Sequence, residues 1–307
     1  MLKLQSLLVL SFLFLSNCGP SDTELAEQGN SHAQYSLGLR YSDEDENLPK
    51  AHKWFLAAAE QGHIAAQFHL GFLYYEGKGV TKNLVKAREW FLKAATFGNS
   101  AARNTIGTMY HNGEGGDKDY AEARKWYLLA WEQGNSMAAF NLGLLHIREE
   151  DYMAAKKCFI SADKMGQPGA SLHLAEMYYE GRGVSKDYAE AKKWFLKGAE
   201  QGVAKAQFEL AEMYYKGEGT TKNEVEAGKW WKKAAEQGDA KHQYELGKAY
   251  ARGIGFPQDE VEAYKWYLLA TAQGYERAKT SMTSLEKKLS MEQRLKGQKL
   301  ASDWEPS

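Results

Sequence analysis

Two short motifs have the residue types and spacing of an acyl-transfer site. Ser161 and Ser284 each precede a lysine by three residues, at Lys164 and Lys287. Penicillin-interacting enzymes carry their serine nucleophile in such an S-x-x-K motif, together with S-D-N and K-T-G motifs. The sequence contains neither companion motif. We therefore interpret both matches as chance, and β-lactamase-like or peptidoglycan-acting chemistry is kept only as an alternative hypothesis.

Signals for phosphate or metal binding are equally weak. Gly71 and the pair Gly77 and Lys78 resemble part of a phosphate loop, but five residues separate the glycines instead of four, and no serine or threonine follows the lysine. The eight histidines form no H-E-x-x-H motif or other close ligand pair. We expect no cofactor and no metal, with His69 and His173 as the remaining candidates for a metal site.

The rest of the sequence is a repeat with a nearly fixed period. Each copy closes on a glycine, and successive closing glycines are 33, 36, 36, 32, 36, 36 and 36 residues apart. A period of 20–50 residues is typical of a solenoid, in which each unit buries its apolar face against the next. The closing glycines are Gly29, Gly62, Gly98, Gly134, Gly166, Gly202, Gly238 and Gly274.

Each copy is predicted to form a helix, a loop and a second helix. In the repeat that ends at Gly238, we expect a first helix over 204–216 and a second over 224–237. A glycine suits the left-handed end of the second helix because it has no Cβ. An Asp or Asn lies three residues before a Glu at the start of the second helix, which predicts capping boxes. These pairs are Asp119 and Glu122, Asp187 and Glu190, Asn223 and Glu226, and Asp259 and Glu262.

The first helix of each copy has an apolar stripe. Counted from the preceding closing glycine, positions 4, 8, 9 and 12 carry mainly Ala, Leu, Gly and Tyr, and they fall on one helical face. A glycine inside a helix costs about 1 kcal/mol, so its recurrence at position 9 predicts close helix packing. The second helix carries a recurring Trp followed by another aromatic residue, and we expect these rings to fill the space between neighbouring repeats.

Two copies deviate from the pattern. The first has an acidic segment at 43–46 in place of the glycine loop, and Pro49 falls in the first turn of its second helix. The fourth has no loop: residues 147–150 join its helices directly, and Cys158 replaces the Trp. After Gly274 the pattern decays, and residues 275–307 are expected to form capping helices, the last of them capped by Ser290.

The N-terminus is predicted to direct the chain to a bacterial envelope. Residues 1–17 combine an early lysine with an apolar run, which is typical of a signal peptide. The segment before Cys18 resembles a lipobox, although Asn17 replaces the usual small residue. We expect acylation of Cys18 and anchoring at the outer membrane, facing the periplasm or the surface, with a periplasmic or secreted protein as the alternative. Residues 18–25 would form a polar tether, and residues 26–274 seven repeats.

The repeat consensus identifies a family. The string A-x-A-Q-[FY]-x-L, followed by a Tyr, two loop glycines and K-W-[FY]-x-x-A-A-E-Q-G, resembles the Sel1-like repeat family, a subclass of the tetratricopeptide-like solenoids. The resemblance implies an all-α, right-handed α/α superhelical solenoid and a protein-interaction scaffold. Some secreted members with paired cysteines are linked to β-lactam binding or hydrolysis. This chain has two cysteines, at positions 18 and 158, and no such pairs.

The candidate partner-binding residues are those that vary on the first helices. Positions 7 and 10 fall on a stripe away from the core, and in related solenoids this helix lines the concave surface. The C-terminal part of the stripe is acidic, which predicts a protein or peptide partner with a basic segment. The net charge of −1 gives no indication of nucleic-acid binding. We define the partner stripe as His69, Phe72, Thr105, Thr108, Asn141, Leu144, His173, Glu176, Glu209, Glu212, Glu245 and Lys248.

Three functions are therefore open. The favoured one is a non-enzymatic scaffold that is anchored at the envelope and binds a partner along the stripe. The alternatives are the enzyme considered above and a secreted or surface host-interaction factor.

Overall fold

The computed structural model describes residues 21–43 and 47–306, and every regular element in these ranges is a helix. The predicted signal peptide and Cys18 lie outside the described residues. None of the described helices has the length and apolar character that a membrane span requires. The helices are α1 Asp22–Glu27, α2 Ser31–Ser42, α3 Leu48–Glu60, α4 Ile64–Glu76, α5 Leu84–Thr96, α6 Ser100–Asn112, α7 Tyr120–Trp131, α8 Ser136–Arg148, α9 Tyr152–Lys164, α10 Pro168–Glu180, α11 Tyr188–Glu200, α12 Ala204–Lys216, α13 Glu224–Glu236, α14 Ala240–Arg252, α15 Glu260–Ala272, α16 Glu276–Glu286 and α17 Met291–Ser302.

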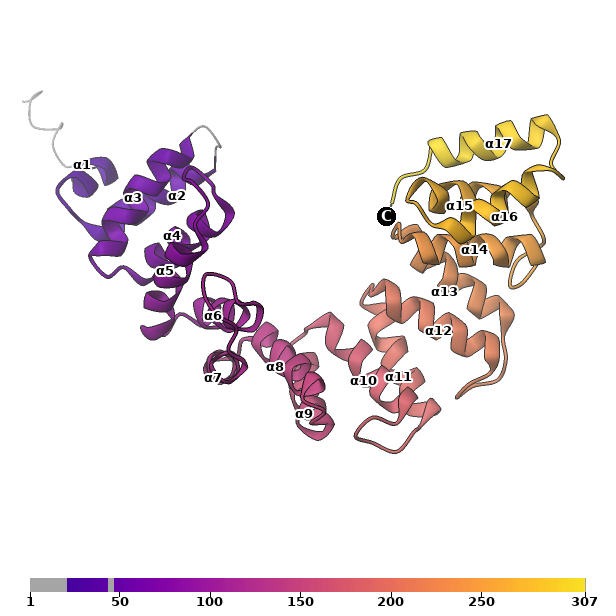
Figure 1. The fold of residues 1–307 in the computed structure, drawn as a ribbon, viewed down its shortest axis with the longest axis horizontal. Helices are drawn as coiled ribbons and strands as arrows, with labels where there is room; N and C mark the ends of the chain where they lie inside the picture. Colours follow the sequence, from indigo (N-terminus) through magenta and orange to yellow (C-terminus); the bar gives the residue numbers. More distant parts are fainter. Residues whose placement is uncertain (1–20, 44–46, 307) are drawn as a thin grey trace, which may run out of the picture. The chain divides into compact units, whose positions relative to one another are not determined.

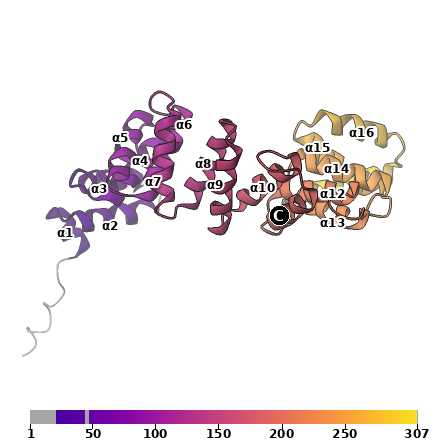
Figure 2. The same ribbon diagram turned by 90° about the horizontal axis from the view of Figure 1, so that it is seen from below.

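The chain forms two compact units, Met1–Asn141 and Leu142–Ser307. Within each unit the helices lie side by side in antiparallel pairs, and each pair packs on the next as in a solenoid (Figures 1 and 2). The pairs are α2 with α3, α4 with α5, α6 with α7, α10 with α11, α12 with α13, and α14 with α15. The predicted all-helical repeat fold is confirmed, and helices α12 and α13 have nearly the expected bounds.

The loop between paired helices is closed by one recurring hydrogen bond. The N–H of the N-cap residue of the second helix donates to the carbonyl of the position-12 residue, as from Asn223 to Tyr214 at 2.8 Å. The N-cap side chain in turn accepts from the backbone N–H three residues on, Glu226 in this repeat. The same two bonds recur at Asp119, Asp187 and Asp259.

The predicted capping boxes are therefore only half formed. The reciprocal bond, from the N-cap N–H to the Glu side chain, is missing at these helices because the N–H already donates to the position-12 carbonyl. The four Glu side chains instead pair with a Lys one turn on, as Glu190 does with Lys193 at 2.7 Å. Complete capping boxes form at Ser21 with Glu24 and at Ser290 with Gln293, where no such loop precedes the helix.

The glycine at position 9 is a packing position, as predicted. A Cβ built on Gly71 would lie 2.7 Å from the ring of Phe91, and one on Gly107 would lie 2.6 Å from the ring of Tyr127. Each ring comes from the second helix of the same repeat. The ring therefore rests on the backbone of the first helix, which only a very small residue allows.

The recurring Trp is not the innermost ring of the repeat. Trp126 and Trp266 are buried, whereas Trp54, Trp90, Trp194 and Trp230 are only partly buried. The aromatic residue that follows the Trp is buried in every copy, as at Phe55, Phe91 and Phe195, and so is Phe159, which follows Cys158 in the fourth copy. The Trp rings lie between repeats as expected, since Trp230 packs against residues of both neighbouring core clusters. The second aromatic residue forms the core within the repeat.

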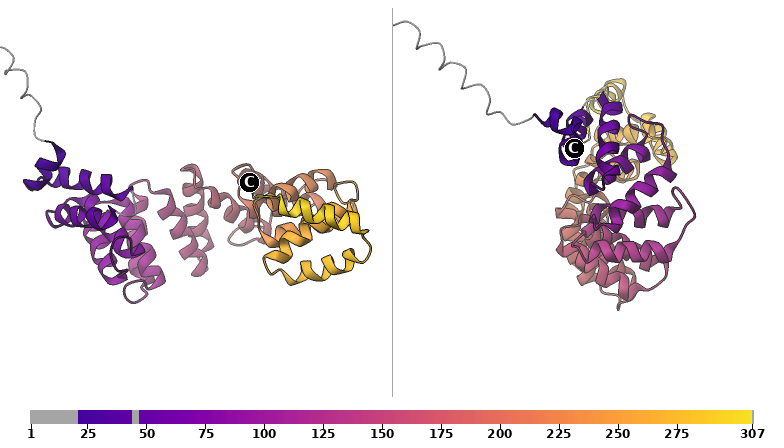
Figure 3. Two further views of the ribbon diagram at one scale, coloured as in Figure 1. Left: turned by 90° about the horizontal axis from the view of Figure 1, so that it is seen from above. Right: turned by 90° about the vertical axis from the view of Figure 1, so that its left-hand side faces the viewer.

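Both ends of the repeat array are covered by helices. Helix α1 begins inside the segment 18–25 that was expected to be a polar tether. Ser21 caps this helix, and its Ala26 is buried against Ala33 and Leu37. The prediction was wrong because only one face of this short helix needs to be apolar, so its sequence is polar overall. At the other end, α16 and α17 both pack on α15 (Figure 3). The expected cap by Ser290 is confirmed.

The shortened fourth copy keeps the closing hydrogen bond of the other repeats. The N–H of Asp151 donates to the carbonyl of His146, the position-12 residue, at 2.9 Å. The tight link is made possible by Glu150, which has a positive φ of 60°. Cys158 is buried in this copy, and burial raises the pKa of its thiol to about 11. The thiol therefore stays protonated and unreactive at neutral pH.

Candidate partner-binding surface

The partner stripe is carried by the first helices of successive repeats. His69 and Phe72 lie on α4, Thr105 and Thr108 on α6, and Asn141 and Leu144 on α8. His173 and Glu176 lie on α10, Glu209 and Glu212 on α12, and Glu245 and Lys248 on α14. Because the two units are separate bodies, the residues up to Asn141 and those from Leu142 onward are considered as two surfaces.

Several stripe residues of the first unit have structural contacts. The His69 ring stacks on Phe55 with 5.2 Å between centroids, and burial lowers the pKa of His69. Thr108 donates to the carbonyl of Asn104 in its own helix. Asn141 donates to the side chain of Asn104 at 3.0 Å and so links α8 to α6. These contacts give His69, Thr108 and Asn141 a structural role in the packing of this helix face.

Phe72 is the stripe residue of the first unit that is most open to solvent. Its side chain is 43% exposed, and the Lys78 ammonium lies 5.8 Å from its ring centroid. Leu144, in the second unit, is partly buried. An exposed aromatic ring on an otherwise polar face is a candidate contact for a partner.

Most acidic residues of the stripe are already paired within the second unit. Glu176 accepts from Lys205 at 2.6 Å. Glu212 accepts from the indole N–H of Trp231 at 3.2 Å and pairs with Lys216 at 3.4 Å. Glu245 pairs with Lys248. The expectation of four carboxylates open to a basic segment therefore has to be corrected, because three of them have in-chain cations. The lysines that reach Glu212 and Glu245 lie on the same helices as these carboxylates, and the lysine that reaches Glu176 lies on α12 of the next repeat.

Glu209 is the exception among these four carboxylates. Within the described residues it has no hydrogen bond and no ion pair. Burial raises the pKa of Glu209 above its ordinary value of 4.5, and the nearby Lys205 and Lys241 offset only part of this effect. At Glu176 burial also acts to raise the pKa, but hydrogen bonds from His173 and Lys205 outweigh it and hold the pKa below 4.5.

These opposite shifts predict opposite effects of two matched substitutions. Ionised Glu176 stabilises the fold above about pH 4.5, and this contribution is lost as the pH falls through its lowered pKa. Ionised Glu209 destabilises the fold, and the penalty disappears as the pH falls from above its raised pKa to 4.5. At pH 7 we expect Glu176→Gln to lower the free energy of unfolding by about 0.5–1 kcal/mol and Glu209→Gln to raise it by about 0.5 kcal/mol.

Urea unfolding of both variants and the wild type at pH 7 and pH 4 measures these differences. The difference at Glu209 should shrink at pH 4. A loss of stability in Glu209→Gln at pH 7 would contradict the proposed desolvation of this carboxylate.

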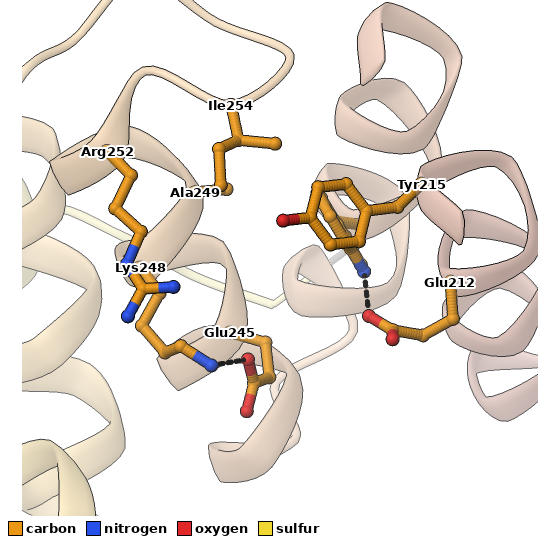
Figure 4. Close-up of a pocket in the computed structure, with 8 residues that line it drawn as sticks. Glu212, Tyr215, Glu245, Lys248, Ala249, Arg252 and Ile254 are labelled. Atoms are coloured by element: carbon orange, nitrogen blue, oxygen red, sulfur yellow. Dashed lines mark hydrogen bonds and ion pairs between the residues drawn. The ribbon is translucent and has the colours of Figure 1, made fainter. Parts of the chain in front are cut away.

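A pocket of about 120 Å³ opens beside the C-terminal end of the stripe. It lies between α12, α13 and α14, and the loop after α14 forms one wall (Figure 4). Figure 4 shows the Tyr215 hydroxyl directed into the space between α12 and α14, facing Ala249. The pocket is lined by Glu212, Tyr215, Trp231, Glu245, Lys248, Ala249, Arg252 and Ile254.

The structure brings Glu212, Glu245 and Lys248 of the predicted stripe together at this pocket. The sequence-based prediction missed Tyr215, Trp231 and Ile254, because they lie at positions that elsewhere belong to the core or the loop. A comparison of loops would have shown one signal. The residue between the two loop glycines is charged in the other glycine loops but is Ile254 here.

The candidate catalytic residues gain no support from their surroundings. Ser284 is exposed on α16, and it makes no hydrogen bond to Lys287 in the part of the chain that the structure describes. Ser161 and Lys164 lie in the last turns of α9. His69 and His173 lie in different units, and no cluster of three metal-ligating side chains occurs among residues 21–43 and 47–306.

A comparison with known proteins finds the same repeat in a described family. The Sel1 repeat profile matches residues 31–63, 64–99, 100–135, 168–203, 204–239 and 242–275. Residues 136–167, which lie between two matched repeats, contain the shortened fourth copy. No curated protein matches the chain.

Solved structures agree with the profile. The Sel1 repeat protein from Oxalobacter formigenes is 30% identical, with a TM-score of 0.68 over 77% of this chain and 96% of that one. A protective antigen of uropathogenic Escherichia coli with an SLR fold is 29% identical, with a TM-score of 0.56 over 91% of this chain and 69% of that one. Yeast Tom70, at 16% identity and a TM-score of 0.54 over 87% of this chain and 57% of that one, shares the fold alone.

Repeat proteins of this class are generally non-catalytic scaffolds that bind other proteins. The match extends over most of the chain and includes the position-9 glycines, the loop glycines and the paired aromatic residues of the core. The chain therefore belongs to the Sel1 repeat family.

Proposed function

We propose that this protein is a non-enzymatic scaffold that binds a protein or peptide partner along its first helices. The observation that carries the proposal is the contrast between the two faces of these helices. Positions 4, 8 and 9 hold the same small or apolar residues in copy after copy and are buried, whereas positions 7 and 10 vary and are open to solvent in part. A varied face on a repeated scaffold suits recognition of one partner.

Within the second unit, Glu209 is the residue we propose to face a basic group of the partner. Its carboxylate has no in-chain cation within ion-pair distance and is held partly desolvated. A cation from a partner would relieve that cost, so this carboxylate favours binding more than its paired neighbours do. In the first unit, exposed Phe72 is the corresponding apolar contact.

Affinity capture from solubilised membranes tests this function. Crosslinked wild-type protein should retain a specific partner, and Glu209→Lys should reduce its recovery severalfold because the charge is reversed. Glu200→Lys is the matched control, since Glu200 is an exposed residue on α11 outside the partner stripe. Equal recovery by the wild type and Glu209→Lys, at unchanged helicity, would contradict a binding role of the α12 face.

We also propose that the protein is anchored at the outer membrane through acylated Cys18. The sequence before this residue is the support for the proposal, and incorporation of an alkyne-tagged fatty acid tests it. The wild type should be labelled, and Cys18→Ala should not. Labelling of the Cys18→Ala variant would contradict the assignment of this residue.

A second candidate function is contact with a host. The observation that favours it is that a relative with 29% identity is a protective antigen of uropathogenic strains. This function requires exposure at the cell surface. Antibody binding to intact cells, compared with permeabilised cells, distinguishes it from a function that is confined to the periplasm.

A further inference from the structure

One kind of hydrogen bond between neighbouring repeats, from a tyrosine hydroxyl to a glutamate, occurs twice among the described residues. The Tyr75 hydroxyl donates to the Glu114 carboxylate at 2.9 Å, and the Tyr179 hydroxyl donates to Glu218 at 2.7 Å. Each tyrosine is at position 13 of its repeat, and each Glu is at position 16 of the next, between the two loop glycines. The contact therefore depends on one pair of positions across adjacent copies.

The Glu114 carboxylate is held from two sides. Besides the Tyr75 hydroxyl, it accepts from the side-chain amide of Asn112 at 2.9 Å. Asn112 is at position 14 of the same repeat as Glu114. The complete site therefore has three groups. They are a tyrosine at position 13, a hydrogen-bond donor at position 14 of the next repeat, and a carboxylate that accepts from both.

A third tyrosine at position 13 lacks its acidic partner. Opposite Tyr215, position 16 is occupied by Ile254 and position 14 by Arg252. Within the described residues the Tyr215 hydroxyl makes no hydrogen bond, although its ring packs on Trp231 with 5.4 Å between centroids. The hydroxyl projects into the pocket between α12 and α14, which Ile254 helps to line (Figure 4).

Two hydrogen-bond donors that line the pocket have no partner among the described residues. Glu212 is occupied by the Trp231 indole and Lys216, and Glu245 by Lys248. Arg252 has no ion pair in the part of the chain that the structure describes. The Tyr215 hydroxyl and the Arg252 guanidinium are therefore the uncommitted polar groups of a pocket whose lining acids are already neutralised.

We propose that this pocket binds the side-chain carboxylate of a glutamate from the partner, in the place that Glu114 and Glu218 occupy in the other repeats. The Tyr215 hydroxyl donates to one oxygen, and Arg252 supplies the charge-assisted donor that Asn112 represents at Glu114. Ile254 and Ala249 contact the methylene stem of the glutamate. The inference rests on the proposed scaffold function and specifies one contact of it, separate from the contact at Glu209.

Binding of defined peptides to the full chain tests the proposal. The probes are amidated pentapeptides of Gly and Ala with a central Glu, Gln or Lys, and the Gln peptide with a free C-terminal carboxylate. Binding is followed by the shift of the Arg252 Nε–Hε resonance. We expect the Glu peptide to bind at least about tenfold more tightly than the other three, since a hydrogen bond to a charged group contributes strongly.

Three variants locate the site. Tyr215→Phe and Arg252→Gln should each weaken binding of the Glu peptide, measured on the remaining pocket resonances. Ile254→Glu should abolish binding, because its own carboxylate then fills the place, as in the two Gly-Glu-Gly loops that the chain already contains. Tyr179→Phe is the matched control, since it removes a hydroxyl that already has its partner, and binding should be unchanged.

Several outcomes would overturn the proposal. These are equal binding of the Glu and Gln peptides, preference for the Lys peptide, binding that requires the free C-terminus, or full binding by Ile254→Glu. If these occur while a partner is still captured by the wild type and lost in Glu209→Lys, the scaffold function stands and the glutamate pocket does not. If neither the peptides nor a membrane partner bind, both proposals fall.

Discussion

Phe91→Ala is expected to lower the free energy of unfolding by about 3–5 kcal/mol, the range for truncation of a fully buried Phe. Phe91 is 1% exposed, and its ring rests on the backbone of α4 at Gly71 and lies 5.5 Å from the ring of Phe68. The cavity left by the ring cannot close easily, because helix backbone forms one of its walls.

Phe72→Ala is the control within the same repeat. Phe72 is 43% exposed, so we expect its truncation to cost less than about 1 kcal/mol. Urea unfolding followed by circular dichroism measures both differences. Similar losses in the two variants would contradict the assignment of the core to the second aromatic residue and of the partner surface to the first helix.

Gly219→Ala is expected to lower the free energy of unfolding by about 2–5 kcal/mol, because two costs add. Gly219 has a φ of 64°, and an alanine there loses about 1–2 kcal/mol in the left-handed region. Its Cβ would also lie 2.2 Å from the Tyr188 carbonyl oxygen and 2.9 Å from the Ala189 nitrogen. These are backbone atoms at the start of α11, so they yield only if the two repeats move apart, at about 1–3 kcal/mol.

Gly202→Ala separates the two costs. Gly202 also has a positive φ, of 84°, but a Cβ there would meet nothing within 4 Å. The left-handed cost is offset in part by the lower entropy of the unfolded chain, so we expect a net loss of about 1 kcal/mol or less. The midpoints of urea unfolding give the comparison, and equal midpoints for the two variants would show that the loop does not pack tightly on α11.

The candidate site could be predicted from sequence only in outline. The first helices, their positions and the variable residues on them follow from the period and the cap residues. The pairing of Glu176 with Lys205, and of Tyr179 with Glu218, joins residues 29 and 39 positions apart. Whether such side chains meet depends on the offset between neighbouring repeats, which no local pattern encodes.

The N-terminal segment also shows that a local pattern does not reveal a tertiary contact. Residues 18–25 were expected to form a polar tether, yet α1 begins at Asp22 because Ala26 can be buried against α2. The prediction of complete capping boxes was wrong for a related reason. The N-cap N–H donates to a carbonyl nine residues earlier, as in the bond from Asn223 to Tyr214, and is not available to the Glu side chain.

The sequence by itself determined the helix pairs and their ends, because caps, positive-φ glycines and apolar periodicity act between residues that are close in the chain. Only the tertiary structure decided which ring enters the core, which carboxylates are neutralised and where a pocket opens. Those outcomes depend on how one copy rests on the next. Position 254 is Ile where two other loops carry Glu, so the Tyr215 hydroxyl has no hydrogen-bond partner among the described residues and faces the pocket.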